Sequence, residues 1–324
     1  MFKVTLSNGV EFNCSPDQTI LDAASSNSIA LEHSCRTGRC GVCVAGVKAG
    51  ESTSLITEEF IVSDDADDFK ILTCCRTPAS NLLLDVQDLG AIGLLKVMTL
   101  PCRVSSLKYV LDDVCCLRLR FPPNSKFLFT PGQYIDVIKG DTRRSYSIAN
   151  APRDDGQIEL QIKKVVDGVM SDYFFNHAAN NDLLRLEGPF GTFSYRSDKS
   201  KNIVLMATGT GIAPLKALLE SFGSALPGKK IFLVWGGRYE ADLYLDFEKI
   251  GVEFVYIPVL SRVSVEGFSF GYVQHTVLDI GLDLSDTTVY ACGSVTMINS
   301  ACELLVENGL SLSDFHSDAF VSSN

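Results

Sequence analysis

The order of apolar and polar residues changes twice along the chain, which divides it into three regions. In the first region, up to about residue 90, short alternating runs such as residues 2–6 and 82–86 predict strands, and one helix is expected at about 20–28. Short strands with a single helix are typical of a β-grasp domain.

The second region is rich in strands that are separated by turn residues. Residues 158–162 alternate apolar and polar side chains, which predicts a barrel strand with one buried and one solvated face. We expect this region to form an antiparallel barrel that closes near residues 188–191.

Strands and helices alternate in the third region. This alternation predicts a parallel sheet with right-handed crossovers, whose ligands bind at the carboxyl ends of the strands. Strands are expected at 203–207, 231–235, 253–259 and 288–291, and helices at about 215–222 and 295–307.

A linker is expected between the first two regions, from Asp88 through Gly90 and Gly93 to about Pro101. The expected fold is therefore multidomain, combining α+β and α/β parts. It comprises a β-grasp domain (1–93), an antiparallel β-barrel domain (99–198) and a parallel-sheet domain (199–324).

Composition and charge restrict the class of protein. With 46% hydrophobic and 21% charged residues, the chain of 324 residues is typical of globular proteins. Its opening turns polar by Ser7, unlike a signal peptide, and no apolar run reaches the roughly 18 residues that a membrane span needs. The net charge of −11 argues against a nucleic-acid partner. Eleven cysteines, an odd number, do not suggest a disulfide framework, so a reducing cytoplasm is expected.

Four of the cysteines carry the most specific signal in the chain. Cys35, Cys40 and Cys43 have the spacing C-x4-C-x2-C, and Cys74 follows about thirty residues later. This spacing matches the ligands of a plant-type [2Fe–2S] cluster, in which each iron needs two thiolates. Small residues between the cysteines let a loop wrap the cluster and direct N–H groups at its sulfur atoms: Thr37, Gly38 and Gly41.

A zinc knuckle or a set of buried thiols is the alternative explanation. Zinc sites usually pair C-x2-C with a second C-x2-C or with His, which fits this spacing poorly. A Rieske centre is disfavoured because the chain has no Cys-x-His pair, and His33 is expected to be a surface or packing residue. Cys75 is expected not to ligate, because neighbouring side chains of an extended chain point in opposite directions.

Acidic residues are concentrated in the first region. Residues 1–90 carry thirteen Asp and Glu against six Lys and Arg, a net charge of −7, and the other 234 residues carry −4. An acidic module with a metal cluster suggests a surface that docks an electron-transfer partner, and solubility alone is the other explanation. The run Asp64–Asp68 is expected to be a solvated turn.

A glycine-rich turn, A-T-G-T-G-I-A-P at residues 207–214, leads from the first strand of the third region into a helix. Glycines let the backbone approach a pyrophosphate, and a helix N-terminus offers N–H donors and a favourable dipole. Pro214 suits the first helical turn. Because the spacing is not the G-x-G-x-x-G of the Rossmann fingerprint, a tight strand-to-helix turn is the alternative.

The barrel region holds a second group of candidate cofactor ligands. Arg144, Tyr146 and Ser147 lie on an expected strand, whose alternation places Arg144 and Tyr146 on the same face. A cation can neutralise phosphate, a ring can stack on a flat cofactor, and a hydroxyl can bond a ring nitrogen. Further on, Gly168 precedes an expected helix that Ser171 could cap, or from which it could bond phosphate. Taken singly, these residues are also ordinary features of a strand and a helix cap.

Together these motifs resemble the ferredoxin–NADP reductase superfamily. The order R-x-Y-S, G-x-x-S, G-T-G-I-A-P and then Cys292-Gly293, behind a plant-type ferredoxin, covers the whole chain and is similar to the ring-hydroxylating oxygenase reductases and their relatives. Longer strings most resemble the CDP-6-deoxy-delta-3,4-glucoseen reductase family, electron donors in 3,6-dideoxyhexose biosynthesis. These strings are residues 71–75, 132–136, 143–152, 290–294 and 317–320.

The resemblance implies roles in binding FAD and the cluster. Arg144 would pair with the flavin phosphate, Tyr146 would pack on the isoalloxazine ring, and Ser147 would bond near its N5. Gly168 and Ser171 would hold the pyrophosphate of FAD. The implied ligands of the cluster are Cys35, Cys40, Cys43 and Cys74.

It also implies roles in binding the nicotinamide dinucleotide. Cys292 and Gly293 would lie beside the nicotinamide, and Asp318 and Phe320 near the flavin. For Cys292, a buried strand thiol is the alternative. The implied catalytic residues are Ser147, Cys292 and Phe320, and the implied dinucleotide loop consists of Gly209, Thr210, Gly211 and Pro214.

The coenzyme is expected to be NADH, with NADPH as the alternative. NAD(H)-using relatives generally lack a cation after the third strand, whereas this chain has Ser261-Arg262 there. In NADP-using relatives such a pair grips the 2′-phosphate.

The resemblance thus implies an NAD(P)H-dependent iron–sulfur flavoprotein reductase. Electrons would pass from NAD(P)H to FAD, to the [2Fe–2S] cluster and on to a partner enzyme. The expected partner is the CDP-6-deoxy-hexulose 3-dehydrase, a PMP- and iron–sulfur-dependent sugar dehydrase. One alternative is the reductase component of an aromatic-ring or alkyl oxygenase, and another is a redox carrier or sensor without turnover.

Overall fold

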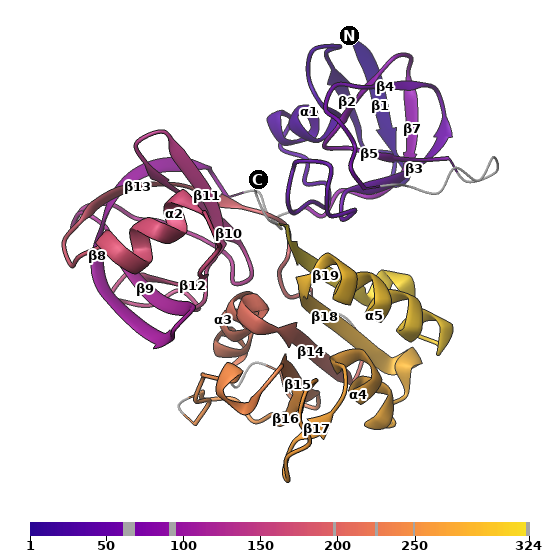
Figure 1. Ribbon diagram of the computed structural model, residues 1–324. Coiled ribbons are helices and arrows are strands. Elements are labelled where there is room, and N and C mark those ends of the chain that lie inside the picture. Colours follow the sequence, from indigo (N-terminus) through magenta and orange to yellow (C-terminus); the bar gives the residue numbers. More distant parts are fainter. Residues whose placement is uncertain (61–68, 91–94, 197–198, 224–225, 249, 322–324) are drawn as a thin grey trace. The chain divides into compact units, whose positions relative to one another are not determined.

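The computed structural model describes residues 1–60, 69–90, 95–196, 199–223, 226–248 and 250–321 (Figure 1). The chain forms two compact units. Unit 1 is Met1–Lys96 with the short segment Phe190–Phe193, and unit 2 is Val97–Pro189 with Ser194–Asn324. The acidic run Asp64–Asp68 and the linker residue Gly93 lie outside the described residues.

Unit 1 has the expected β-grasp, a five-stranded mixed sheet accompanied by one helix. The first strand pairs antiparallel with the second and parallel with the last, so the two ends of the region meet in the middle of the sheet. The sheet order is β2 (Glu11–Cys14), β1 (Phe2–Leu6), β7 (Leu82–Asp85), β3 (Val44–Ala49) and β5 (Lys70–Leu72), and a separate ribbon joins β4 (Ser52–Ser54) to β6 (Arg76–Pro78).

The single helix of unit 1, α1 (Ile20–Ser26), starts at a side-chain cap. The Thr19 hydroxyl accepts a hydrogen bond from the Asp22 N–H at 3.1 Å, which satisfies one of the free donors at the helix start. Ile20 and Leu21 are buried in the core formed with the sheet. The helix ends two residues earlier than expected, because Ser28 has a positive φ of 59°.

The first half of unit 2 is a six-stranded antiparallel barrel, as expected. The order is β11 (Thr142–Ser147), β10 (Tyr134–Lys139), β13 (Leu183–Phe190), β8 (Met98–Leu111), β9 (Val114–Arg120) and β12 (Ile158–Lys163). An isolated bridge between Ile148 and Leu160 joins the residue after β11 to β12, and these are the two outermost strands of the sheet order.

Two expectations for the barrel are wrong. β8 begins at Met98 and pairs Pro101 with Arg185, so the linker does not extend to Pro101. β12 is not half solvated, because its polar residues Glu159 and Gln161 are buried as well. Their burial has a physical reason: both side chains bond residues of the parallel-sheet region, which covers that face.

The second half of unit 2 is the expected parallel sheet, now with six strands. The four expected strands are present, three of them with slightly longer bounds, whereas the strand expected at 253–259 begins two residues later, at Val255. One further strand is added at each edge. The order is β17 (Ser269–Phe270), β16 (Val255–Leu260), β15 (Lys230–Gly237), β14 (Asn202–Thr208), β18 (Thr287–Ser294) and β19 (Phe315–Phe320).

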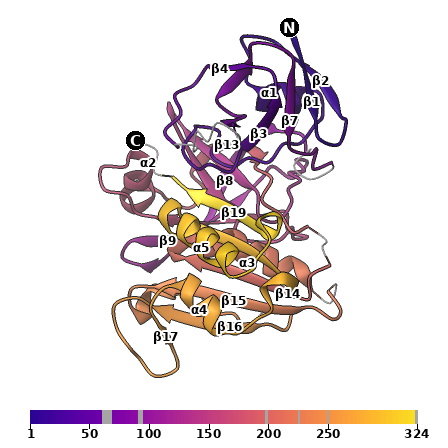
Figure 2. The ribbon, with the colours of Figure 1, turned by 90° about the vertical axis from the view of Figure 1, so that its right-hand side faces the viewer.

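Three helices pack on this sheet. α3 (Ile212–Phe222) packs on β14 and β18. α4 (Val273–Asp279) packs against α5 (Val295–Glu307), and Figure 2 shows these two helices side by side. α5 matches its expected bounds, because Ser294 caps its start and Asn308 ends it. Among the described residues, the helices include none that is long and apolar enough to cross a membrane.

Candidate functional site

The first three cysteines lie in a loop between α1 and β3, called here the cysteine loop (residues 35–43). Arg36, Gly38 and Gly41 have positive φ angles of 57°, 75° and 76°, so the loop curls tightly. A side chain on Gly38 would meet the Cys75 Sγ at 2.7 Å and the Thr57 carbonyl oxygen at 2.8 Å. Glycine is therefore required at this position for both conformation and space.

The structure arranges the four cysteines as two thiol pairs. The Sγ atoms of Cys43 and Cys74 are 3.2 Å apart, and Cys35 is hydrogen-bonded to Cys40. In each pair, that hydrogen bond lowers the pKa of one thiol, Cys35 or Cys74, and raises the pKa of the other. No three metal-ligating side chains of the described residues converge on a single ion, but two thiol pairs suit the two irons of a [2Fe–2S] cluster.

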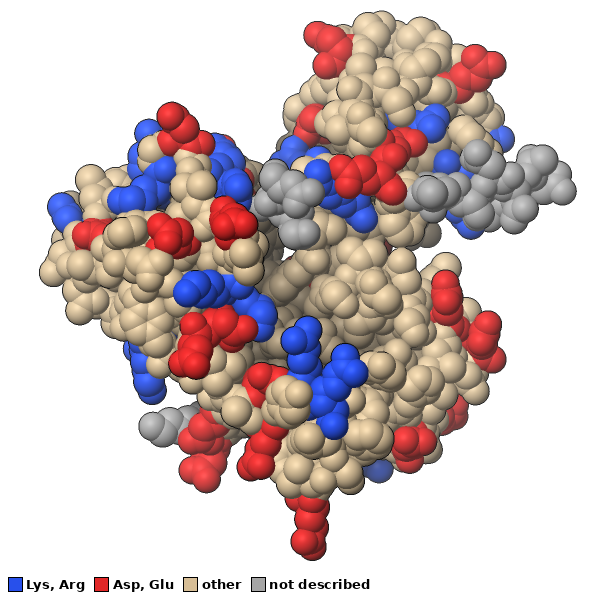
Figure 3. Space-filling model, viewed as in Figure 1, with Lys and Arg blue, Asp and Glu red and all other residues tan. Residues whose placement is uncertain are grey.

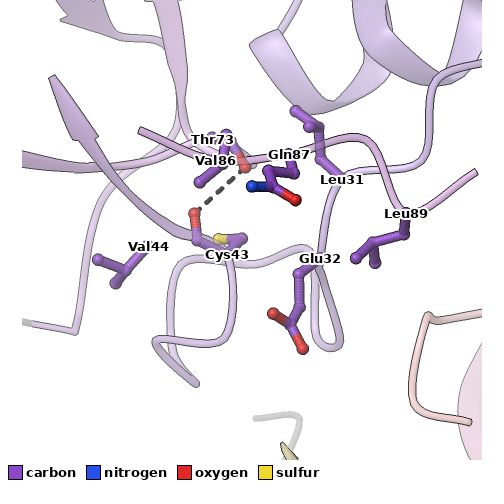
Figure 4. A pocket seen from close by; sticks show the side chains of 8 residues that line it. All are labelled: Leu31, Glu32, Cys43, Val44, Thr73, Val86, Gln87 and Leu89. Carbon is purple, nitrogen blue, oxygen red and sulfur yellow. Dashed lines mark hydrogen bonds between the residues drawn. The ribbon is translucent and has the colours of Figure 1, made fainter. Parts of the chain in front are cut away.

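Thr73 holds the two halves of the second thiol pair together. Its N–H and its hydroxyl both donate to the carbonyl oxygen of Cys43, at 3.1 and 3.2 Å. Figure 4 shows the hydroxyl bond beside a cavity of about 170 Å³ that Cys43 and Thr73 line. The spacing of Cys43 and Cys74 is thus set by backbone contacts that do not depend on the thiols.

Cys75 lies closer to the thiol pairs than the sequence suggested. Residues 73–75 form a turn rather than an extended chain, and the Cys75 N–H bonds the Leu72 carbonyl at 2.9 Å. The Cys75 Sγ is 3.6 Å from that of Cys74, and burial, followed by the Cys74 charge, raises its pKa to about 12. The argument from opposite side-chain directions is therefore wrong, although Cys75 as a non-ligand stays a prediction.

A distant segment of unit 1 braces the cysteine loop. The Thr192 hydroxyl accepts from the His33 N–H at 2.9 Å and donates to the His33 carbonyl at 3.1 Å. His33 lies two residues before Cys35, and its ring bonds the Leu31 carbonyl at 2.9 Å, in keeping with a packing role. No sequence motif marked Thr192, because its partner is 159 positions away.

Ion pairs compensate part of the negative charge of unit 1. Figure 3 shows acidic and basic side chains interspersed on the visible face of this unit. Arg76 makes a bidentate contact with Glu58 at 2.7 and 3.0 Å, beside the turn that carries Cys75. Further pairs are Lys3–Glu11, Arg36–Asp22, Arg39–Glu59 and Lys48–Asp85. Electrostatic docking of a partner, one of the two explanations for the acidic residues, would therefore rest on less charge than their count suggests.

In the barrel, β11 separates its two arginines onto opposite faces. Arg143 pairs with Asp136 at 3.0 Å and with Glu187, whereas Arg144 is bound to no carboxylate among the described residues. Tyr146 is on the same face as Arg144 and packs edge-on against Phe174, with ring centroids 6.1 Å apart. The arrangement leaves a cation and an aromatic ring side by side, which suits a flavin nucleotide.

A short helix next to β11 carries the second part of this site. α2 (Val169–Asp172) starts after Gly168 and packs against β11. The Ser171 hydroxyl accepts a hydrogen bond from the Val165 N–H at 2.7 Å, so it closes the loop before the helix rather than capping it. The same hydroxyl keeps its own proton to donate.

The end of β11 meets the edge of the parallel sheet. The Ser147 hydroxyl donates to the Asp318 carboxylate at 3.4 Å, and both residues are buried. In the parallel register, Asp318 of β19 lies beside Cys292 of β18. The Cys292 thiol is fully buried, and burial, followed by the charge of Asp318, raises its pKa. Phe320 at the end of β19 is 37% exposed.

The glycine-rich turn forms a 3-10 segment (Gly209–Gly211) that leads directly into α3, with Pro214 in the first turn as expected. Gly209 has a φ of 54° and faces open space, which leaves room for a ligand. Thr210 is buried, and a side chain on Gly211 would overlap the carbonyl oxygen of Cys292. Gly293 is equally tight, because a side chain there would overlap Thr208.

Three further contacts hold the glycine turn and the loops after β15 and β16, and they involve Trp235, Gly237 and Arg238, which no sequence motif marked. The Trp235 Nε1–H of β15 donates to the Gly209 carbonyl at 3.0 Å and so holds the glycine turn. At the carboxyl ends of β15 and β16, the Arg262 N–H donates to the Arg238 carbonyl at 3.2 Å, which joins the two loops. The Ser261 hydroxyl donates to the Gly237 carbonyl at 3.2 Å.

Comparison with known proteins agrees with these three sites. The models that match describe a 2Fe-2S iron-sulfur cluster binding domain (residues 4–80), an oxidoreductase FAD-binding domain (101–195) and an oxidoreductase NAD-binding domain (205–303). The zinc-knuckle alternative is thereby set aside, and the resemblance drawn from the motifs is confirmed.

Relatives and solved structures cover almost the whole chain. The CDP-6-deoxy-L-threo-D-glycero-4-hexulose-3-dehydrase reductase of Yersinia pseudotuberculosis is 39% identical over 321 residues, 98% of this chain and 97% of its own. Reductase component 1 of the terephthalate 1,2-dioxygenase of Comamonas is 30% identical, covering 97% and 95%. A cytochrome P450 reductase from Amycolatopsis shares the fold, with a TM-score of 0.78 and 24% identity over 99% of both chains.

The thiol pairs, the strand β11 (called here the flavin strand) and the glycine turn Gly209–Gly211 (called here the dinucleotide turn) therefore occur in one chain, which matches reductases over almost its full length. The chain is an NAD(P)H-dependent oxidoreductase with a [2Fe–2S] cluster and FAD. It belongs to the family of iron–sulfur flavoprotein reductases that includes the CDP-6-deoxy-L-threo-D-glycero-4-hexulose-3-dehydrase reductase of Yersinia pseudotuberculosis.

Proposed function

We propose that this reductase delivers electrons to a CDP-6-deoxy-hexulose 3-dehydrase, a PMP- and iron–sulfur-dependent sugar dehydrase. The observation that carries the proposal is the 39% identity, over 98% of the chain, to a relative named for that role. The identity to the reductase component of terephthalate dioxygenase is lower, at 30% over a similar length. An oxygenase as the acceptor is the second candidate.

Each of the two thiol pairs is assigned to one iron of the cluster. Cys35 and Cys40 would bind one iron, and Cys43 and Cys74 would bind the other, because the two thiols of each pair are hydrogen-bonded to each other. Gly38 and Gly41 keep the loop close enough for N–H groups to face the cluster sulfurs. Thr73 and Thr192 fix the backbone near these ligands, through hydrogen bonds to the carbonyl oxygens of Cys43 and His33.

The barrel would hold FAD, which when bound would supply a two-electron acceptor for the reduced nicotinamide and a one-electron donor for the cluster. Arg144 binds its phosphate, Tyr146 packs on its ring system, and Gly168 and Ser171 hold its pyrophosphate. Support comes from the guanidinium of Arg144, which binds no carboxylate among the described residues, and from the contact of α2 with β11. Ser147 bonds near the flavin N5 through its hydroxyl oxygen, and the donation of its proton to Asp318 fixes the orientation of that hydroxyl.

The parallel sheet holds the dinucleotide at the carboxyl ends of its strands. Gly209, Thr210, Gly211 and Pro214 bind the pyrophosphate, and Cys292 and Gly293 border the nicotinamide. Phe320 shields the flavin from water at the end of β19. The support is the open space at Gly209 together with the tight packing of Gly211 on Cys292.

NADH is the coenzyme in this proposal. The Asp242 carboxylate accepts N–H bonds from Arg238 and Tyr239 at 2.7 and 3.0 Å, in the loop that Arg262 contacts. Its negative charge opposes a 2′-phosphate there, and the Ser261 hydroxyl already has an acceptor. A higher kcat/KM with NADPH than with NADH would contradict this choice.

The proposal also includes three domains, at residues 1–93, 99–198 and 199–324. It further includes a cytoplasmic location. The start of β8 at Met98 supports a barrel domain that begins near residue 99. The eleven free cysteines suit a reducing compartment.

The acceptor is tested with purified partners, the dehydrase under anaerobic conditions and the oxygenase in air. NADH, this reductase and the Yersinia 3-dehydrase with its CDP-hexulose substrate should give the deoxygenated product, with the dehydrase left inactive when the reductase is omitted. The terephthalate oxygenase component, with oxygen and terephthalate, is the matched alternative. Faster product formation with the oxygenase than with the dehydrase would favour the second candidate.

A further inference from the structure

A charge cluster joins the barrel to the parallel-sheet region within unit 2. It consists of Lys216 and Glu220 on α3, Glu159 on β12, and Arg153 and Arg118. Lys216 is at its centre, with a side chain only 13% exposed. Its ammonium group donates to the Ala149 carbonyl at 2.9 Å, to Glu159 at 3.2 Å and to Glu220 at 2.6 Å. All three donors of this lysine are therefore used.

The barrel side of the cluster is the segment that follows the flavin strand. Ala149 comes two residues after Ser147, and its N–H donates to the Glu159 carbonyl at 2.7 Å. Ala151 donates its N–H to the Glu220 carboxylate at 3.1 Å. Residues 149–151 are thus held by β12 on one side and by α3 on the other.

The helix side of the cluster starts at the dinucleotide turn. α3 begins at Ile212, directly after Gly211, and Lys216 lies in its second turn. One lysine therefore links the helix that opens at the dinucleotide turn to the backbone that ends the flavin strand. No other lysine of the described residues makes this connection.

We propose that Lys216 is a positioning residue for flavin reduction: it sets the distance and angle between the dinucleotide turn and the flavin strand. This inference rests on the proposed function, which places FAD at β11 and the dinucleotide at Gly209–Gly211. Buried ion pairs contribute little net stability, because desolvation offsets their attraction, so stability alone does not account for this cluster. The geometry of this cluster is nevertheless demanding, because every carboxylate oxygen of Glu159 and Glu220 accepts a hydrogen bond. A displacement of about 1 Å between reacting groups can slow a reaction by roughly a hundredfold.

The test uses the full-length holoenzyme and three variants. Lys216→Met keeps the length of the side chain but removes the charge and the three hydrogen bonds. Because this leaves two buried carboxylates without their cation, the triple variant Lys216→Met, Glu159→Gln, Glu220→Gln removes both charges as well. The control is Lys201→Met, since Lys201 forms an ion pair with Asp286 at 2.9 Å but is 78% exposed and bonds only within the parallel-sheet region.

Flavin reduction by NADH is followed by stopped-flow absorbance, together with the long-wavelength charge-transfer band that reports stacking of nicotinamide on flavin. Lys216→Met and the triple variant should reduce flavin about ten- to a hundredfold more slowly. Both should show a weakened band, with FAD content and the Kd for NADH changed less than about threefold. Hydrogen exchange of the peptide containing Ala149 and Ala151 should also be faster, and Lys201→Met should match the wild type in every measurement.

Three outcomes would overturn the proposal. One is a flavin-reduction rate and charge-transfer band in Lys216→Met equal to those of the wild type. The second is a full recovery of both in the triple variant, which would assign the defect to unpaired carboxylates. The third is an equal loss in Lys201→Met. If Lys216→Met does not fold, the triple variant alone decides the question by the same two measurements.

Discussion

The hydroxyl of Ser147 donates a hydrogen bond to the carboxylate of Asp318, although the two residues are 171 positions apart in the chain. Ser147 ends the flavin strand of the barrel, and Asp318 lies on the edge strand of the parallel sheet beside Cys292. The contact brings the proposed flavin and nicotinamide residues of the barrel and the sheet to one buried point.

A double-mutant cycle tests whether Ser147 acts through Asp318. Ser147→Ala and Asp318→Asn should each slow flavin reduction, and the double variant should be no slower than the more impaired single variant. Residues in one hydrogen-bond network show interaction energies of about 0.5–3 kcal/mol. Stopped-flow rates with NADH give the cycle, and strictly additive effects would show that the two residues act independently.

The thiol pairs predict which cysteines are needed for the cluster. Purified protein should contain two irons and two labile sulfides per chain, and Cys40→Ser should lose them while retaining FAD. Cys74→Ser should lose the iron as well, and Cys75→Ser should keep it, as iron analysis and EPR of the reduced protein will show. Loss of iron in Cys75→Ser but not in Cys74→Ser would reverse the assignment.

The two adjacent arginines of β11 form a matched pair for testing flavin binding. Arg144→Ala removes a charge-assisted phosphate contact worth about 1.5–3 kcal/mol, so FAD should bind roughly ten- to a hundredfold more weakly. Arg143→Ala should bind FAD normally, because Arg143 is engaged with Asp136 and Glu187. Flavin content after dialysis and titration of the apoprotein measure both, and equal retention in the two variants would contradict the role of Arg144.

Gly211 and Gly251 form a matched pair of glycines, because Gly211 has no room for a side chain and Gly251 has room for one. An added methyl group at Gly211 would overlap the Cys292 carbonyl, whereas nothing lies within 4 Å of the same position on Gly251. Gly211→Ala should lower the free energy of unfolding by about 1–3 kcal/mol and weaken NADH binding, and Gly251→Ala should do neither. Urea denaturation and fluorescence titration with NADH provide the measurements. Normal NADH affinity in a folded Gly211→Ala protein would exclude this turn from the site.

Salt should slow electron delivery to the acceptor only modestly. Electrostatic steering can raise association rates by about 10- to 1,000-fold. Because ion pairs within unit 1 neutralise part of its acidic charge, we expect an increase at the lower limit of this range. We expect acceptor reduction to fall by no more than about tenfold between low and high salt. Flavin reduction by NADH over the same range is the control, and a rate that does not change with salt would leave solubility as the role of the acidic residues.

Patterns that are local in the sequence predicted much of this protein. The cysteine spacing identified the cluster, since one short loop supplies three of its thiols and backbone geometry limits how such a loop can fold. Alternation and helical periodicity located the four central strands of the parallel sheet and the bounds of α5, because those periods follow directly from strand and helix geometry. The glycine turn at 209–211 was equally visible, as a strand followed by a helix constrains the residues between them.

Contacts between distant segments were decided only by the tertiary structure. The alternation of β12 correctly marks its apolar face, but it cannot show that Glu159 and Gln161 are covered by α3 and by Tyr244. The pairing of Thr192 with His33 and of Ser147 with Asp318 likewise depends on how the chain packs, over 159 and 171 positions. A buried polar group needs a partner, yet the sequence does not say which one, because any donor or acceptor that the fold brings near can satisfy it.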